Sequence, residues 1–207
     1  MSIIALPINL LVSQHSFGLH RYDLTYGGGD TGTTQTTVLG FPRRTCSLAS
    51  PELISDEDAA RWRTLLHALG GRVNHLAVHD RLNSVPRGTA RGTWTASAAA
   101  AAGAKTMVIR AGADQAGKTL LAGDWFGVNQ GGTNRQMLHV QADTVVDGSG
   151  LMAVSFETVL RSPVVANSAI AWSYPTCLMK SQSDSDSWSV SKGKQGGFSL
   201  DLLEQWY

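Results

Sequence analysis

Charged residues are scarce in this sequence, and neither sign is in excess. Of its 207 residues, 16% are Asp, Glu, Lys or Arg, against about a quarter in an ordinary globular protein. The 17 Lys and Arg residues balance 16 Asp and Glu residues, which leaves a formal net charge of +1. Such a chain has no long-range attraction for nucleic acid or for an anionic membrane. We therefore expect no specific nucleic-acid binding and no membrane binding.

Cysteines and long apolar runs are also scarce. The two cysteines, Cys46 and Cys177, do not make a disulfide framework or a zinc site. Two reduced, buried thiols are the commoner arrangement, and the sequence leaves open whether the pair is bridged. The apolar N-terminal run, residues 1–17, has no basic segment before it and is interrupted by Pro7 and Asn9. It is too short to span a bilayer and lacks a cleavage signal, so we expect a soluble protein made in the cytoplasm.

One segment has the pattern of an amphipathic helix. Ser55 is a good N-cap, three acidic residues follow it in the first turn, and Gly70 and Gly71 can end the helix. Steps of three and four residues predict one apolar stripe, formed by Ala59, Trp62, Leu65, Leu66 and Leu69.

The rest of the chain favours short strands, because its 22 glycines are spread among many Ser and Thr residues. Strands are predicted at residues 73–79, 105–110, 124–128 and 137–142, and residues 147–150, Asp-Gly-Ser-Gly, predict a turn. Three later strands each place three apolar residues on one face: Met152, Val154 and Phe156; Ile170, Trp172 and Tyr174; Phe198, Leu200 and Leu202. One helix among many strands indicates a mainly β protein of sandwich or barrel type.

Residues 112–119, GADQAGKT, match the phosphate-loop pattern G-x-x-x-x-G-K-[ST]. That loop needs a helix beginning at its lysine, whose N-terminal amides hold the phosphates. Gly123 would end such a helix after barely one turn, and no alternating strands and helices follow. We therefore expect a Gly-rich turn with an exposed Lys118.

The remaining motifs carry little chemistry. His75 and His79, with Asp80 beside them, are four residues apart on a predicted strand, and such positions lie about 13 Å apart. Residues 183–187, Ser-Asp-Ser-Asp-Ser, begin like a calcium loop but lack its later glycine and glutamate. No hydrolase, metalloprotease or redox motif is present. We expect no catalytic, cofactor-binding or metal-binding residues, and packing roles for Trp62, Trp172 and Trp188.

The second half of the sequence resembles a known family. Residues 118–128, KTLLAGDWFGV, resemble the L-x-A-G-D-x-F element of distal tail proteins from long-tailed, non-contractile bacteriophages. The order of later segments is similar too: Leu160-Arg161, then residues 169–175, AIAWSYP, then residues 197–204, GFSLDLLE. The helix, the strand at residues 73–80 and the linker at residues 86–92, PRGTARG, also resemble that family. The likeness covers about residues 55–206.

This resemblance implies a fold and a function. Residues 1–90 and 177–207 would form a β-sandwich core with one helix, and residues 91–176 an inserted small OB-like β-barrel. Six copies would close into a hub ring at the virion's tail tip. The ring would join the tail tube protein to the tip hub, tape measure or tail fibre proteins, with no enzymatic activity and no cofactor. The insert contains basic residues but no interleaved aromatic platform for single strands: Lys105, Arg110, Lys118, Arg135 and Arg161.

Two other classes of function remain open at this point. A carbohydrate-binding module recognising a host-surface glycan would use Trp125, Trp172 or Trp188 for stacking. A small nucleotide-dependent enzyme would be built on residues 112–119. Binding to a panel of glycans would favour the first of these, and stabilisation by a nucleotide would favour the second.

Overall fold

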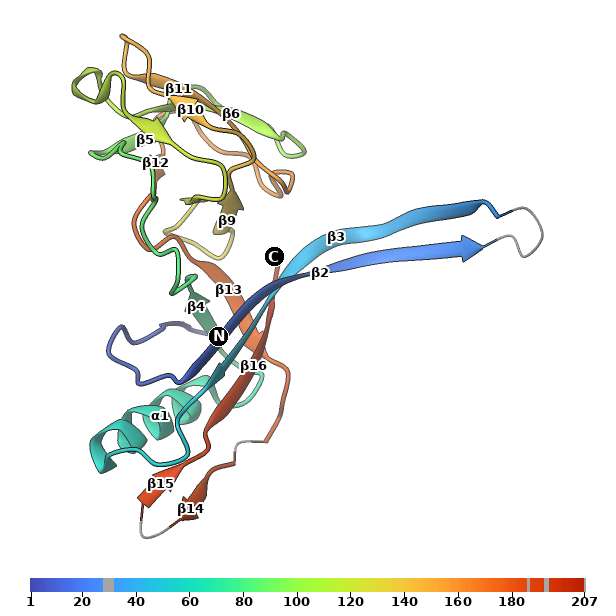
Figure 1. Cartoon of the computed structure of the whole chain (residues 1–207), viewed down its shortest axis with the longest axis vertical. Helices are drawn as coiled ribbons and strands as arrows, with labels where there is room; N and C mark the ends of the chain where they lie inside the picture. The colour runs from blue at the N-terminus through green and yellow to red at the C-terminus, as the bar shows by residue number, and fades with distance from the viewer. Residues whose placement is uncertain (28–31, 186, 192–193, 207) are drawn as a thin grey trace.

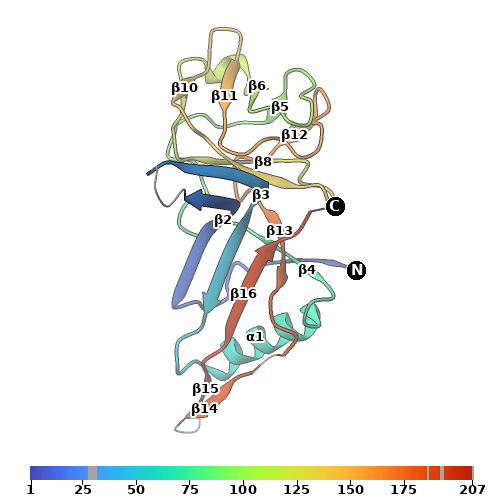
Figure 2. The same ribbon diagram turned by 90° about the vertical axis from the view of Figure 1, so that its right-hand side faces the viewer.

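The computed structural model describes residues 1–27, 32–185, 187–191 and 194–206. A lower body contains a six-stranded sheet and the helix α1, and an upper body contains shorter strands from the middle of the chain (Figure 1). A long hairpin leaves the lower body between them and extends far to one side in Figure 1, which is toward the viewer in Figure 2.

The lower sheet has the strand order β1-β4-β13-β16-β3-β2. Its strands are β1 (Ile3–Ala5), β2 (Gln14–Gly27), β3 (Thr34–Ala49), β4 (His75–Val78), β13 (Cys177–Ser181) and β16 (Ser199–Glu204). The β1–β4 pair is parallel and the other pairs are antiparallel. The last two strands of this sheet in chain order, β13 and β16, therefore lie in its middle.

The helix α1 (Asp56–Leu69) begins and ends as its sequence predicts. The Ser55 hydroxyl accepts the Asp58 backbone N–H at 3.1 Å, and Gly70 ends the helix with φ 58°, a conformation that suits glycine. Its predicted apolar stripe is buried and belongs to the lower hydrophobic cluster. Within the described residues, no helix is long and apolar enough to cross a membrane.

The upper body contains a four-stranded sheet of order β11-β6-β5-β12 and two two-stranded ribbons. Its elements are β5 (Trp94–Ala96), β6 (Thr106–Arg110), the 3-10 turn η1 (Ala113–Gln115), β7 (Thr119–Leu120), β8 (Trp125–Val128), β9 (Gln136–His139), β10 (Thr144–Val145), β11 (Leu151–Ser155) and β12 (Ala169–Ile170). The ribbons pair β7 with β10 and β8 with β9. A third ribbon, β14 (Ser189–Ser191) with β15 (Lys194–Gly196), lies at the bottom of the lower body (Figure 1).

Buried apolar side chains form two clusters. The lower cluster draws on residues 6–78 and 177–202, together with Trp125 and Met137. The upper cluster draws on residues 90–170. Strand β9 lies between them, because Met137 belongs to the lower cluster and its neighbour Leu138 to the upper one. The prediction that residues 91–176 are an inserted domain means that the rest of the chain folds without them. It stays a prediction.

The predicted mainly β class with one α-helix is confirmed. The lower body is one six-stranded sheet packed against α1, and the upper strands form no closed barrel in the part of the chain described. The strand predicted through Ile170, Trp172 and Tyr174 is wrong beyond Ile170. Tyr174 has φ 48°, which an extended strand cannot contain, and the chain turns there before it enters β13.

Candidate assembly surfaces

The sheet has an open edge along β2, and the outer halves of β2 and β3 form an arm (Figures 1 and 2). Strand β16 pairs with β3 only from Thr45 to Ala49. Among the described strands, residues 20–27 and 34–43, which we call the arm, therefore pair only with each other. Eight strand residues extend about 26 Å. The arm thus presents two faces and two strand edges beyond the lower body.

The outer arm is apolar and nearly uncharged. Val38, Leu39 and Phe41 are 75%, 65% and 55% exposed, and Tyr26 is 60% exposed. Between residues 22 and 41, the described part of the chain carries one charged side chain, Asp23. Surfaces that stay in water usually carry more charge, whereas apolar patches of this kind mark contact sites.

A second apolar surface lies at the opposite edge of the same sheet, where β1 is the outermost strand. Ile3 and Ile8 are 38% and 74% exposed in this N-terminal segment. Between the segment and the outer side of α1 lies a hollow of about 360 Å³, which we call the α1 groove. Its lining residues are Ile4, Pro7, Glu57, Ala60, Arg61, Thr64, Leu65 and Ala68.

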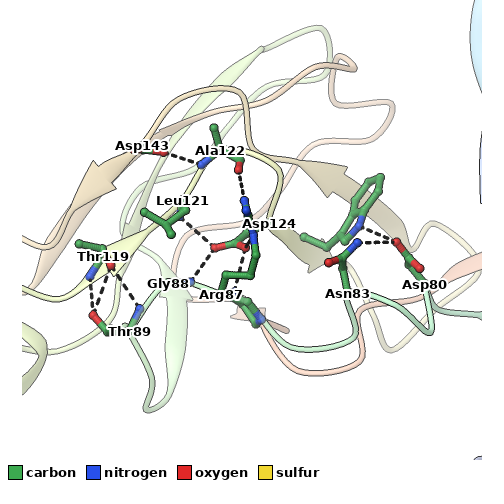
Figure 3. Close-up of polar contacts among 12 residues, drawn as sticks. Asp80, Asn83, Arg87, Gly88, Thr89, Thr119, Leu121, Ala122, Asp124 and Asp143 are labelled. Atoms are coloured by element: carbon green, nitrogen blue, oxygen red, sulfur yellow. Dashed lines mark hydrogen bonds and ion pairs between the residues drawn. The ribbon is translucent and has the colours of Figure 1, made fainter.

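The link into the upper body is held by one carboxylate (Figure 3). Asp124 is 2% exposed. Its Oδ1 accepts the Arg87 backbone N–H at 2.9 Å, and its Oδ2 accepts the N–H groups of Gly88 at 3.0 Å and Leu121 at 2.9 Å. The Arg87 side chain also bonds to Asp124 and to the Ala122 carbonyl. Asp124 thus has a structural role, since it holds residues 87–88 and 121 together.

Close backbone packing continues this link. A Cβ atom at Gly88 would overlap the Thr119 carbonyl and the Leu120 Cα, so only glycine fits there. Beside it, the Thr119 N–H donates to the Thr89 hydroxyl at 3.1 Å (Figure 3). Residues 88–89 are therefore fastened to β7 as the chain enters the upper body.

Trp125 fixes the upper body against the lower one. Its side chain is 7% exposed and belongs to the lower cluster. Its Nε1–H donates to Asp80 Oδ2 at 3.1 Å, and the Arg44 guanidinium lies 4.3 Å from the ring centre. The His139 ring meets it edge-on at 4.6 Å. A buried indole with a paired N–H and a cation on its face forms a rigid joint.

A buried ion pair strengthens the same joint. Glu204, at the end of β16, is 2% exposed and accepts the Arg44 backbone N–H at 2.9 Å. It also pairs with Arg161 of the upper body at 2.5 Å. Burial lowers the pKa of Arg44, and the nearby Glu204 opposes that shift. Loss of either partner of a buried pair leaves an uncompensated charge, so both bodies depend on this contact.

The phosphate-loop match forms a turn that leads into a strand. Gly112 has φ 106°, the 3-10 turn η1 follows, and Thr119 begins β7 where a nucleotide site needs a helix. The Lys118 N–H donates to the Gln115 carbonyl at 2.9 Å, and the Gly117 N–H donates to Val146 at 2.9 Å. Lys118 itself is exposed. The N–H groups of Gly117 and Lys118 thus donate to backbone carbonyls of the protein itself.

The other predicted motif residues lie apart or have structural roles. His75 begins β4 and His79 follows it, while the Asp80 carboxylate is bonded to Trp125 and to the Leu82 N–H. Within the residues that the structure describes, no group of three His, Cys, Asp or Glu side chains could hold a metal. The serine loop at 183–185 bonds to itself, and Asp186 lies outside the described residues.

The two cysteines are buried and unbridged. Burial raises the pKa of Cys46 to about 12 and the pKa of Cys177 well above its usual value. Since the thiolate is the reactive form, both thiols are poor nucleophiles near neutral pH.

The three tryptophans considered for sugar stacking do not share a surface. Trp125 is buried in the joint. The Trp172 Nε1–H donates to the Gly92 carbonyl at 2.7 Å in the upper body, and the Arg91 guanidinium lies 5.2 Å from its ring centre. Trp188 is 42% exposed beside β14 at the far end of the molecule (Figures 1 and 2). No joint platform results, so carbohydrate binding stays an untested prediction.

The arm and the α1 groove are the functional candidates that sequence reasoning missed. A signal for the arm was present: Tyr22, Leu24 and Tyr26 alternate with polar residues before the run Gly27-Gly28-Gly29. Thr-rich sequence of high β propensity follows that run. The groove had no local signal, because α1 and the N-terminal segment come together only in the fold.

Comparisons with other proteins add no identification. No protein-family model matches this sequence, and no curated protein matches it either.

Proposed function

We propose that this protein is a structural subunit of a bacteriophage tail tip, a distal tail protein whose copies join into a closed ring. In this proposal the ring, of six copies, connects the tail tube to the tip hub and its fibres. The family resemblance of residues 118–128 suggests the role. The observation that carries it is the exposed, nearly uncharged arm at one edge of the lower sheet.

An arm of this kind needs a partner. A two-stranded ribbon is marginally stable in water by itself, and open strand edges invite pairing with other chains. The arm leaves one edge of the sheet, while the apolar α1 groove lies at the other. Contacts between two different surfaces of the same chain repeat from copy to copy, and they close into a ring when the rotation permits.

The test is the assembly mass of the purified protein over a wide concentration range, measured by native mass spectrometry and by electron microscopy. We expect ring-shaped particles containing a fixed number of copies. Tyr26→Asp on the arm, where Tyr26 is 60% exposed, should abolish them, because it places a charge in the contact. Val165→Asp is the matched control, since Val165 is 70% exposed on the upper body.

Both variants should keep the thermal midpoint of the wild type, because exposed substitutions usually change stability by less than about 0.5 kcal/mol. A protein that stays monomeric at the highest attainable concentration, and that is absent from purified virions, contradicts the proposed function. Rings that form equally well with Tyr26→Asp contradict the role of the arm.

A further inference from the structure

The α1 groove is lined mainly by apolar and small side chains. Ile4 and Pro7 border it on the side of the N-terminal segment, and Leu65 lies at its base. Along α1, Ala60 and Thr64 are exposed and one turn apart, and their small side chains allow another chain to approach the helix backbone closely. A hollow of about 360 Å³ is large enough for one or two apolar side chains together with a piece of backbone.

The groove can be covered without burying an unpaired charge. Its two charged side chains, Glu57 and Arg61, are paired with each other, and Arg61 is also 3.0 Å from Asp58. The arm contributes only Asp23 between residues 22 and 41 of the described chain. Charges left unpaired in an interface oppose association. The paired charges of the groove and the near absence of charge on residues 22–41 of the arm therefore favour contact between the two.

The arm presents a matching face. Tyr22, Leu24 and Tyr26 are two residues apart on β2, so their side chains share one side of the ribbon. Leu24 and Tyr26 are 41% and 60% exposed. Aromatic side chains with few rotatable bonds are frequent anchors of protein interfaces.

The arm of a chain does not reach the groove of the same chain. In Figure 1 the arm runs to one side of the lower body, while the N-terminal segment and α1 lie on the other side. The two surfaces lie at opposite edges of one sheet. An arm in this groove must therefore belong to a different molecule.

From these observations we infer that the α1 groove receives the arm of a second copy of this chain, with the Leu24 and Tyr26 face turned toward Ala60 and Thr64. This inference rests on the proposed function and specifies its contact. Each copy then gives one arm and receives one arm, so every arm in a closed ring is covered.

Cross-linking between introduced cysteines tests this contact directly. The double variant Tyr26→Cys, Thr64→Cys is treated with a short bismaleimide and analysed on denaturing gels. We expect a ladder of covalent multimers that ends at the mass of the ring. The native thiols give little background, because Cys46 and Cys177 are buried and have raised pKa values. The matched control pairs Tyr26→Cys with Val165→Cys on the upper body.

A second variant needs no cross-linker. Ala60→Arg changes an exposed helix residue at the groove and should weaken self-association by about tenfold or more, with an unchanged thermal midpoint. Rings without the 26–64 cross-link, equal cross-linking of the control pair, or unchanged assembly of Ala60→Arg would each overturn the groove contact and leave the proposed function standing. Absence of any oligomer would overturn the proposed function as well.

Discussion

At Asp124, one carboxylate accepts three backbone N–H groups in the link between the two bodies. Asp124→Ala leaves one buried and two partly buried donors without this partner, and each costs about 1 kcal/mol. We expect the free energy of unfolding to fall by about 3 kcal/mol in urea denaturation.

The control for this variant is Asp143→Ala. Asp143 is exposed and accepts one N–H, from Ala122, at 2.7 Å, so its loss should cost about 1 kcal/mol or less. Equal losses for the two aspartates would show that burial at Asp124 contributes nothing.

Three histidines near the joint make stability depend on pH. Burial lowers the pKa of His15, His79 and His139 below the usual 6.5, and Arg81 adds to the effect at the first two. A lowered pKa means that the unfolded chain binds protons first as the pH falls. Stability should therefore be full above about pH 6.5 and decline below it. Thermal midpoints measured between pH 8 and pH 5 check this expectation.

His15→Phe tests one contributor that can be removed without the loss of a hydrogen bond. Both ring nitrogens of His15 are buried without a hydrogen-bond partner, so phenylalanine should be tolerated at pH 8. The decline in thermal midpoint at acid pH should become shallower. A slope identical to that of the wild type would exclude His15 as a source of the effect.

The resemblance of residues 118–128 to a family element does not tell what Asp124 and Trp125 do. The partners of Asp124 at Arg87 and Gly88 are 37 and 36 residues away, and Asp80 is 45 residues from Trp125. Hydrogen bonds over such separations depend on how the two bodies meet, and local patterns contain no information about that. Trp125 is a candidate for sugar stacking from the sequence alone, because the sequence shows that a residue is tryptophan but not whether its side chain is buried.

Among the elements, α1 was predictable to the residue because its cap, its acidic first turn and its apolar stripe agree. The strands with one buried face, such as β11 and β16, were also predicted. Alternating residues of the arm indicate a strand, but both faces of the arm are exposed, so the sequence does not tell that this strand extends beyond the lower body. The α1 groove depends on packing and lay beyond sequence reasoning.

The helix cap gives a prediction at this scale. Ser55→Ala removes the hydroxyl that accepts the Asp58 N–H and donates to the Asp58 carboxylate at 2.6 Å. We expect a loss of about 1 kcal/mol in the free energy of unfolding. Thr64→Ala, on the exposed side of the same helix, should change it by less than about 0.5 kcal/mol. A cap variant as stable as Thr64→Ala would contradict the reading of this helix start.

For the whole molecule, the question is whether the lower body folds without residues 92–175. The lower cluster contains Trp125 and Met137 from that segment. Replacing residues 92–175 by a short Gly/Ser linker therefore removes these two side chains and leaves a cavity in the lower cluster. We expect a cooperatively folded core with a lowered thermal midpoint, measured by calorimetry, because the cluster otherwise comes from residues 6–78 and 177–202.

Truncation after Thr176 is the matching control, because it removes the two central strands β13 and β16. That chain should lose its near-ultraviolet circular dichroism from the lower body. An unfolded excision variant together with a folded truncation variant would disprove the division into core and insert.

The central position of β13 and β16 also sets the order of events during protein synthesis. While the ribosome is still translating residues 177–204, β4 and β3 have no strand between them, and the apolar side chains of α1 face an incomplete sheet. The upper body, whose strands end at Ile170, can form earlier. We expect the lower body to complete its sheet only after residues 177–204 have left the ribosome. Each arm is then anchored to a complete sheet only after β16 has been synthesised.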